Sequence, residues 1–229
     1  MIFFNVIDSS FEDAGKRGIL RMGEFCDEIE KRGISASFKI HLRAETVCKL
    51  DDDLLVRLKG AGVDIIGVGV ESGLAHELAS YKKIASVDES FHAVLRIEDK
   101  DKFFCIVGHM MFSPVLELKD LMEKVKFLEK IDRAWDYLDM SNNVIIFPGT
   151  AYHISMSEQG LTSECEELTG SVPYRYKDPR VEDVAREMGD LKKKCPSIID
   201  LNNKLYDSMN IASRYQNRLN EHLSARPEF

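Results

Sequence analysis

Residues that could bind a ligand or move a proton follow several apolar runs of this sequence. The clearest is Glu71, which ends the run from Val63 to Val70 and is followed by Ser72 and a glycine. The run is too short and too rich in β-branched residues for a helix, so it predicts a buried parallel strand. In parallel α/β proteins, functional groups lie at the carboxyl ends of the strands. Glu71 therefore occupies a position where ligands usually bind.

Other polar residues follow the remaining predicted strands, at Asp8 to Ser10, His41 to Glu45, His109 to Ser113 and Asn142 to Thr150. The candidate catalytic residues are Asp8, Arg43, Glu71 and His109. Arg43 would hold an anionic group, while Glu71 or His109 would move protons. The alternative is structural: Arg43 and Glu71 would form an ion pair that orders the strand ends, and each histidine would serve packing. A metal centre is disfavoured, because the sequence lacks His-x-His and His-Glu-x-x-His spacings.

The elements that must position these residues alternate between strand and helix. Strands are predicted at 2–7, 36–42, 63–71, 103–112 and 137–147, and the segments between them carry helical apolar stripes. This order predicts parallel strands with right-handed crossovers. A closed parallel barrel needs about eight strands. The expected fold is therefore α/β, a partial, open, TIM-like (β/α) barrel of about five strands over residues 1–170, with a helical C-terminal extension over 171–229.

Five segments, in this order, resemble the radical S-adenosylmethionine superfamily, particularly its cobalamin-linked and tailoring enzymes. They are Phe3 to Phe11, with Ser9 in place of the second acid of a paired acidic motif, Ser37 to Glu45, with Arg-Ala, Val68 to Gly73, with Glu-Ser-Gly, Gly108 to Pro114, and Ile146 to Thr150, with Pro-Gly-Thr. The resemblance implies that Glu71 contacts S-adenosylmethionine and that Arg43 and Asp8 line the same cavity. The implied cofactor-binding residues are Glu71, Ser72, Arg43 and Ser113.

Members of that superfamily also carry an upstream first strand and a Cys-x3-Cys-x2-Cys loop, which holds a [4Fe–4S] cluster. The cysteines of this chain are far apart, at Cys26, Cys48, Cys105, Cys165 and Cys195. Because cluster irons need thiolate ligands that converge, we expect no iron–sulfur cluster here. The chain would then be a truncated relative with another use, or it would work beside a polypeptide that supplies the missing part.

Composition restricts the function further. The net charge of −8 disfavours nucleic-acid binding. The sequence shows no signal peptide and no run of roughly 20 apolar residues, so no membrane segment is expected. Scattered cysteines indicate reduced thiols and a cytoplasmic protein. An apolar edge strand at Ile2 to Ile7 would favour a homodimer.

Together these features favour a biosynthetic enzyme that acts on a small-molecule substrate by non-redox acid–base catalysis, as a lyase, isomerase or transferase. Intact S-adenosylmethionine could be retained as a ligand. Two alternatives stay open. The chain could be a non-catalytic partner subunit of a complete radical enzyme or carrier protein, or a fragment of an ordinary radical S-adenosylmethionine enzyme.

Overall fold

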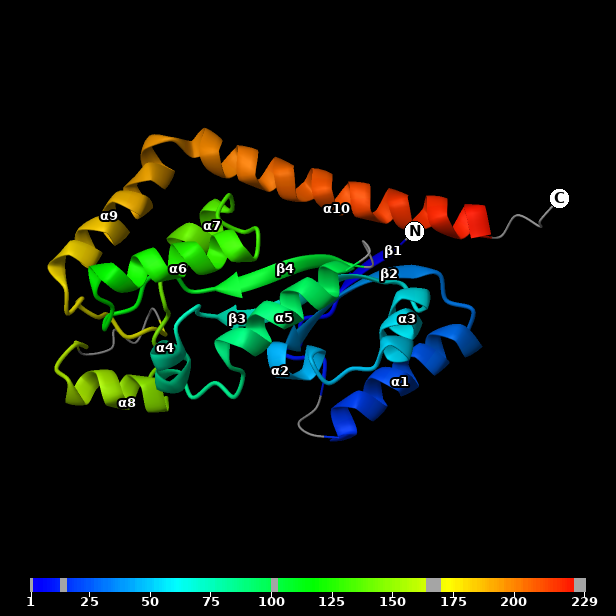
Figure 1. The fold of residues 1–229 in the computed structure, drawn as a ribbon, viewed down its shortest axis with the longest axis horizontal. Helices are drawn as coiled ribbons and strands as arrows, with labels where there is room; N and C mark the ends of the chain where they lie inside the picture. Colours follow the sequence, from blue (N-terminus) through cyan, green and yellow to red (C-terminus); the bar gives the residue numbers. More distant parts are fainter. Residues whose placement is uncertain (1, 13–15, 100–102, 164–169, 225–229) are drawn as a thin grey trace. The chain divides into compact units, whose positions relative to one another are not determined.

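The computed structural model describes residues 2–12, 16–99, 103–163 and 170–224, and shows an α/β protein (Figure 1). The strands are β1 (Ile2–Asn5), β2 (Ala36–Arg43), β3 (Val63–Glu71) and β4 (Phe104–His109). The helices are α1 (Lys16–Lys31), α2 (Ala44–Val47), α3 (Asp52–Gly60), α4 (Ala75–Ser80), α5 (Val87–Glu98), α6 (Leu118–Lys130), α7 (Tyr137–Ser141), α8 (Ala151–Glu158), α9 (Pro179–Lys194) and α10 (Pro196–Ser224).

The four strands form an open parallel sheet in the order β1-β2-β3-β4. In its registers Ile2 lies opposite Ala36, and Arg43 lies opposite Gly69. Consecutive strands are sheet neighbours with helices in their connections, as is usual between parallel strands. The predicted fold class, an open partial barrel followed by C-terminal helices, is confirmed.

The segment predicted as a fifth strand, 137–147, is different. It begins as the short helix α7, because the side chain of Asp136 accepts a hydrogen bond from the backbone N–H of Leu138 and caps the first turn. After the helix, Asn143 forms an isolated parallel bridge with Phe112. The fifth strand is thus reduced to a single bridge beyond the end of β4.

Local capping signals explain where helices α3 and α6 begin. Asp51 caps α3 by accepting a hydrogen bond from the N–H of Leu54 at 2.7 Å. Helix α6 begins with a reciprocal capping box between Glu117 and Asp120. Gly67 inside β3 is required by packing, because a Cβ there would lie 2.4 Å from Nδ1 of His41.

The chain divides into two compact units, which we describe separately. Unit 1 comprises Met1–Gly69, Asp88–Val107 and Asn203–Phe229, and unit 2 comprises Val70–Val87 and Gly108–Asn202. Each of the two segments of unit 2 starts near the carboxyl end of a strand, the first at the end of β3 and the second at the end of β4. Part of its core is a buried cluster of Val144, Ile146, Tyr152, Met156, Leu161 and Val172. Among the described residues, no helix has the length and apolar character needed to cross a membrane.

Candidate functional site at the ends of strands β3 and β4

Strand β3 ends in a tight turn centred on Glu71. The backbone N–H of Ser72 donates to the carbonyl oxygen of Val70 at 2.8 Å, and φ of Glu71 is 64°. A three-residue turn with a positive φ at its centre is the rare, strained class of γ-turn. Non-glycine residues in strained conformations persist where their surroundings hold them in place, and they cluster at ligand sites.

The side chain of Glu71 pairs with a lysine of the same unit. One carboxylate oxygen lies 2.5 Å from Nζ of Lys83, and the two side chains are 24% and 42% exposed. An ion pair that is partly exposed to solvent contributes little to stability. The carboxylate can therefore exchange this ammonium group for the cationic group of a ligand.

Close packing explains why a glycine, Gly73, follows Glu71 and Ser72. A Cβ on Gly73 would lie 2.5 Å from Cβ of Phe127, a buried residue of α6. Helix α6 thus packs directly against the backbone beyond the turn. The Glu-Ser-Gly order of the sequence combines a strained carboxylate, a buried hydroxyl and a position without a side chain.

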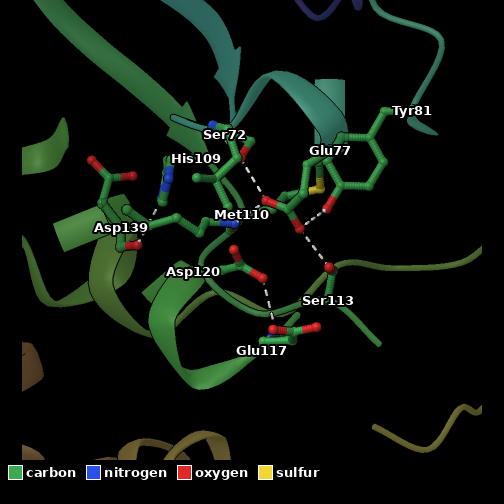
Figure 2. Close-up of polar contacts among 11 residues, drawn as sticks. Ser72, Glu77, Tyr81, His109, Met110, Ser113, Glu117, Asp120 and Asp139 are labelled. Carbon is green, nitrogen blue, oxygen red and sulfur yellow. Dashed lines mark hydrogen bonds and ion pairs between the residues drawn. The ribbon is translucent and has the colours of Figure 1, made fainter. Parts of the chain in front are cut away.

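Glu77 of α4 is the centre of a buried polar cluster (Figure 2). One carboxylate oxygen accepts hydrogen bonds from Ser113 at 2.5 Å and Tyr81 at 2.9 Å. The other accepts from Ser72 at 2.5 Å and from Nζ of Lys124 at 2.5 Å. The side chains of Glu77 and Lys124 are both 0% exposed. Both oxygens of this carboxylate therefore have two donors.

Competing effects set the charges of Glu77 and Lys124. Burial raises the pKa of Glu77, but the charge of Lys124 and the hydrogen bonds from Lys124, Ser113 and Ser72 outweigh it, so its pKa lies below the usual value. Burial lowers the pKa of Lys124, while Glu77 opposes that shift. A carboxylate with four donors is the charged form, and its neighbour Lys124 is then its counter-ion.

His109, the last residue of β4, lies in the same unit and is buried (Figure 2). Its Nδ1 is 3.1 Å from the carbonyl oxygen of Asp139, and its Nε2 has no hydrogen-bond partner among the described residues. Burial, together with the charge of Lys124, lowers the pKa of His109 to about 3. Burial, with the charge of Asp136, raises the pKa of Asp139 to about 8. His109 and most of the Asp139 carboxyl are consequently neutral near pH 7.

The other two predicted catalytic residues, Asp8 and Arg43, belong to unit 1. Asp8 pairs with Arg21 at 3.3 Å, and both side chains are substantially exposed. The backbone N–H of Arg43 donates to one carboxylate oxygen of Glu12 at 2.9 Å. Glu12 is buried, and its second carboxylate oxygen has no hydrogen-bond partner within the part of the chain that the structure describes. Each of these residues lies at or just after the end of β1 or β2, as the sequence indicated.

In unit 2 the structure brings together Ser72 and Ser113, which share Glu77, while Glu71 adjoins Ser72 and forms its ion pair with Lys83. Sequence reasoning missed Glu77, Lys124 and Asp139, and did not connect Lys83 with Glu71. One signal for Lys124 was present: it lies three residues after Leu121 and four before Leu128, within the apolar stripe of α6. A lysine in such a stripe needs a buried partner.

A metal centre has no support among the described residues, where no group of three or more His, Cys, Asp or Glu side chains could hold an ion. Of the described cysteines, Cys26 and Cys105 are buried, Cys48 and Cys195 are partly buried, and no two of these four form a disulfide. Cys165 lies outside the described residues. The absence of an iron–sulfur cluster stays a prediction.

No protein-family model matches this sequence, and a search of curated proteins gave no match. Solved structures do match. The cobalamin-dependent S-adenosylmethionine radical enzyme OxsB, with aqua-cobalamin and S-adenosylmethionine bound, is 16% identical, with a TM-score of 0.71 over 93% of this chain and 39% of that one. OxsB with aqua-cobalamin alone gives a TM-score of 0.67 over 93% and 40%, also at 16% identity.

A further match is the radical S-adenosylmethionine methyltransferase TsrM from Kitasatospora setae, with cobalamin and a [4Fe–4S] cluster bound. It is 13% identical, with a TM-score of 0.54 over 69% of this chain and 31% of that one. This chain thus has the fold of part of the cobalamin-dependent radical S-adenosylmethionine enzymes, and spans about two fifths of the length of OxsB. The structural side of the resemblance is confirmed, while the truncation and the missing cluster loop stay predictions.

Proposed function

We propose that this chain binds S-adenosylmethionine at the end of β3, with the carboxylate of Glu71 as a direct contact. The observation that carries the proposal is the pairing of this strained, partly exposed carboxylate with an ammonium group, that of Lys83. S-adenosylmethionine offers two cations, an α-ammonium and a sulfonium, and a charged hydrogen bond to a carboxylate is among the strong ones. The bound S-adenosylmethionine of OxsB supports the choice of ligand.

The other predicted cofactor-binding residues have different roles in this proposal. Ser72 and Ser113 are fully buried and donate to Glu77, so we assign them to supporting the turn rather than to contacting the ligand. Arg43 lies in unit 1. Its proposed contact with an anionic group is a separate proposal, for which Arg43→Gln is the test.

We further propose that the chain acts on a small metabolite without redox chemistry, with Glu71 as the residue that moves protons. Glu71 is partly exposed and can exchange protons with a ligand. His109 was the alternative acid or base, but its buried imidazole, with Nδ1 beside a backbone carbonyl, is neutral near pH 7, and a pKa of about 3 makes it a weak base. Bound S-adenosylmethionine would supply an activated sulfonium centre.

Calorimetry with S-adenosylmethionine tests the binding proposal. We expect a dissociation constant below about 1 mM for the wild-type chain and weaker binding by at least about tenfold for Glu71→Gln, because a charged contact is lost. Glu158→Gln, an exposed residue at the end of α8, is the matched control and should leave affinity unchanged. S-adenosylhomocysteine, which lacks the sulfonium charge, shows which cation Glu71 contacts. No heat from the wild-type chain at millimolar ligand would reject the proposal.

A second candidate function is a subunit or segment of a radical S-adenosylmethionine enzyme. It is favoured by the share of OxsB that the chain spans and by the apolar edge strand β1, where Ile2 is 66% exposed. The genomic reading frame tests it. A frame that continues upstream into a Cys-x3-Cys-x2-Cys segment would support the candidate, and a stop codon directly upstream, with no such gene nearby, would oppose it.

A further inference from the structure

Lys124 is a fully buried cation on α6, and its ammonium group makes two short contacts. It donates to a carboxylate oxygen of Glu77 at 2.5 Å and to the backbone carbonyl oxygen of Met110 at 2.5 Å. Met110 follows β4, whereas Glu77 lies beyond β3. One ammonium group therefore connects the segments that follow two neighbouring strands.

These contacts close a ring around the strained turn. The N–H of Met110 donates to the carbonyl oxygen of Glu71 at 2.9 Å, while its own carbonyl oxygen is held by Lys124. On the other side, the hydroxyl of Ser72 donates to the same oxygen of Glu77 that Lys124 contacts. The path Lys124–Met110–Glu71–Ser72–Glu77 thus returns to Lys124.

Stability alone does not account for such an arrangement. Buried ion pairs cost so much desolvation that an apolar pair of similar volume is often as stable or more so. What the ion pair adds here is direction: through Met110 it holds the carbonyl group of Glu71, and through Glu77 it holds the side chain of Ser72, directly after a residue with φ of 64°. A strained conformation persists only when surrounding contacts over-determine it.

We propose that Lys124 and Glu77 are positioning residues, which hold the γ-turn so that the carboxylate of Glu71 points at its ligand. This inference rests on the proposed binding of S-adenosylmethionine at Glu71. Neither side chain touches the ligand, because both are fully buried and bonded to each other. Their effect on binding therefore passes through the backbone of the turn.

Two variants separate positioning from stability. Lys124→Met leaves the charge of Glu77 buried and unpaired, so we expect a lower melting temperature and S-adenosylmethionine binding weakened by about tenfold, the lower range for loss of a supporting partner at metal sites. The double variant Glu77→Gln/Lys124→Met removes both charges of the buried pair and keeps an acceptor for the serines. We expect its melting temperature to recover while its affinity stays low. Affinity that recovers with stability would overturn the proposal.

A double-mutant cycle tests whether Lys124 acts through Glu71. In a Glu71→Gln background, Lys124→Met should weaken binding by less than about twofold, because the contact it positions is already gone. A full further tenfold loss would show an independent effect and contradict the proposal. Lys126→Met is the matched control: Lys126 lies on the same helix, is exposed and pairs with Glu123, so its loss should change neither affinity nor stability.

Hydrogen exchange tests the ring independently of the ligand, so that its failure can be told from failure of the proposed function. The amides of Ser72 and Met110 should exchange at least about tenfold faster in Glu77→Gln/Lys124→Met than in the wild-type chain, because local opening becomes easier. Unchanged protection of both amides would reject the positioning proposal whether or not S-adenosylmethionine binds. If the wild-type chain has no affinity for S-adenosylmethionine, faster exchange in the double variant still supports the ring, because this comparison does not involve the ligand.

Discussion

The ammonium group of Lys83 lies 2.5 Å from the carboxylate of Glu71, at the atom to which we assign a ligand cation. Lys83 is the more exposed of the two side chains and belongs to the segment after α4. The lysine and the ligand would therefore compete for one carboxylate. Binding requires that the internal ion pair open.

Lys83→Met should accordingly tighten the binding of S-adenosylmethionine. The gain should reach up to about fivefold, since exposed ion pairs are worth roughly 0.2–1 kcal/mol. Calorimetry at low and high salt measures it, and the difference between the two chains should shrink as salt screens the pair. Weaker binding by Lys83→Met would instead mean that the lysine contacts the ligand.

The buried carboxyl of Asp139 should make stability depend on pH. Its folded pKa of about 8 lies far above the ordinary 3.8, so the folded state holds the extra proton and this contribution falls as pH rises toward 8. The folded pKa of His109, about 3, lies below the ordinary 6.5, so its contribution rises with pH up to 6.5. Between pH 5 and 6.5 the two slopes nearly cancel.

Asp139→Asn removes one of these slopes. We expect its free energy of unfolding to rise by about 1.5 kcal/mol from pH 5 to 6.5, at ~1.4 kcal/mol for each pKa unit in that window. The wild-type chain should change little there and lose about 1 kcal/mol from pH 6.5 to 8. Urea denaturation across this pH range measures both curves. Parallel curves for the two chains would show that Asp139 is not buried in its protonated form.

Gly73→Ala should destabilise the chain by about 1–3 kcal/mol, because the new methyl group would force Phe127 and α6 away from the turn. Gly189→Ala is the matched control. Gly189 lies in α9 with open space around its Cβ position, and alanine there should raise the free energy of unfolding by roughly 0.5–1 kcal/mol. Denaturant midpoints measure both. A neutral Gly73→Ala would contradict the close packing of α6 on the turn.

The homodimer expected from the sequence stays a prediction. Strand β1 is an edge of the described sheet, and its Ile2 side chain is exposed. If two copies pair through this edge, Ile2→Lys should shift the dimer toward monomer, because edge charges oppose strand pairing. Light scattering behind a sizing column gives the mass. A monomer in both chains would rule out edge pairing as the basis of assembly.

The sequence was sufficient for most elements because their signals are local. Asp51 and the apolar stripe after it specify α3, and the β-branched run before Glu71 specifies β3. The prediction of a fifth strand was wrong at its start. The apolar residues of 137–147 indicated a strand, but Asp136 caps a short helix there. The pairing of Glu77 with Lys124 spans 47 residues and depends on how α4 and α6 pack, so the sequence alone could only show that Lys124 interrupts an apolar stripe.

A crystal structure of the chain with S-adenosylmethionine tests the central claim most directly. Our account predicts a cationic group of the ligand within hydrogen-bond distance of the Glu71 carboxylate, with Nζ of Lys83 displaced from it and the positive φ of Glu71 retained. It would be contradicted by S-adenosylmethionine bound away from Glu71, or by crystals that hold no ligand at millimolar concentration while the Glu71–Lys83 pair stays closed.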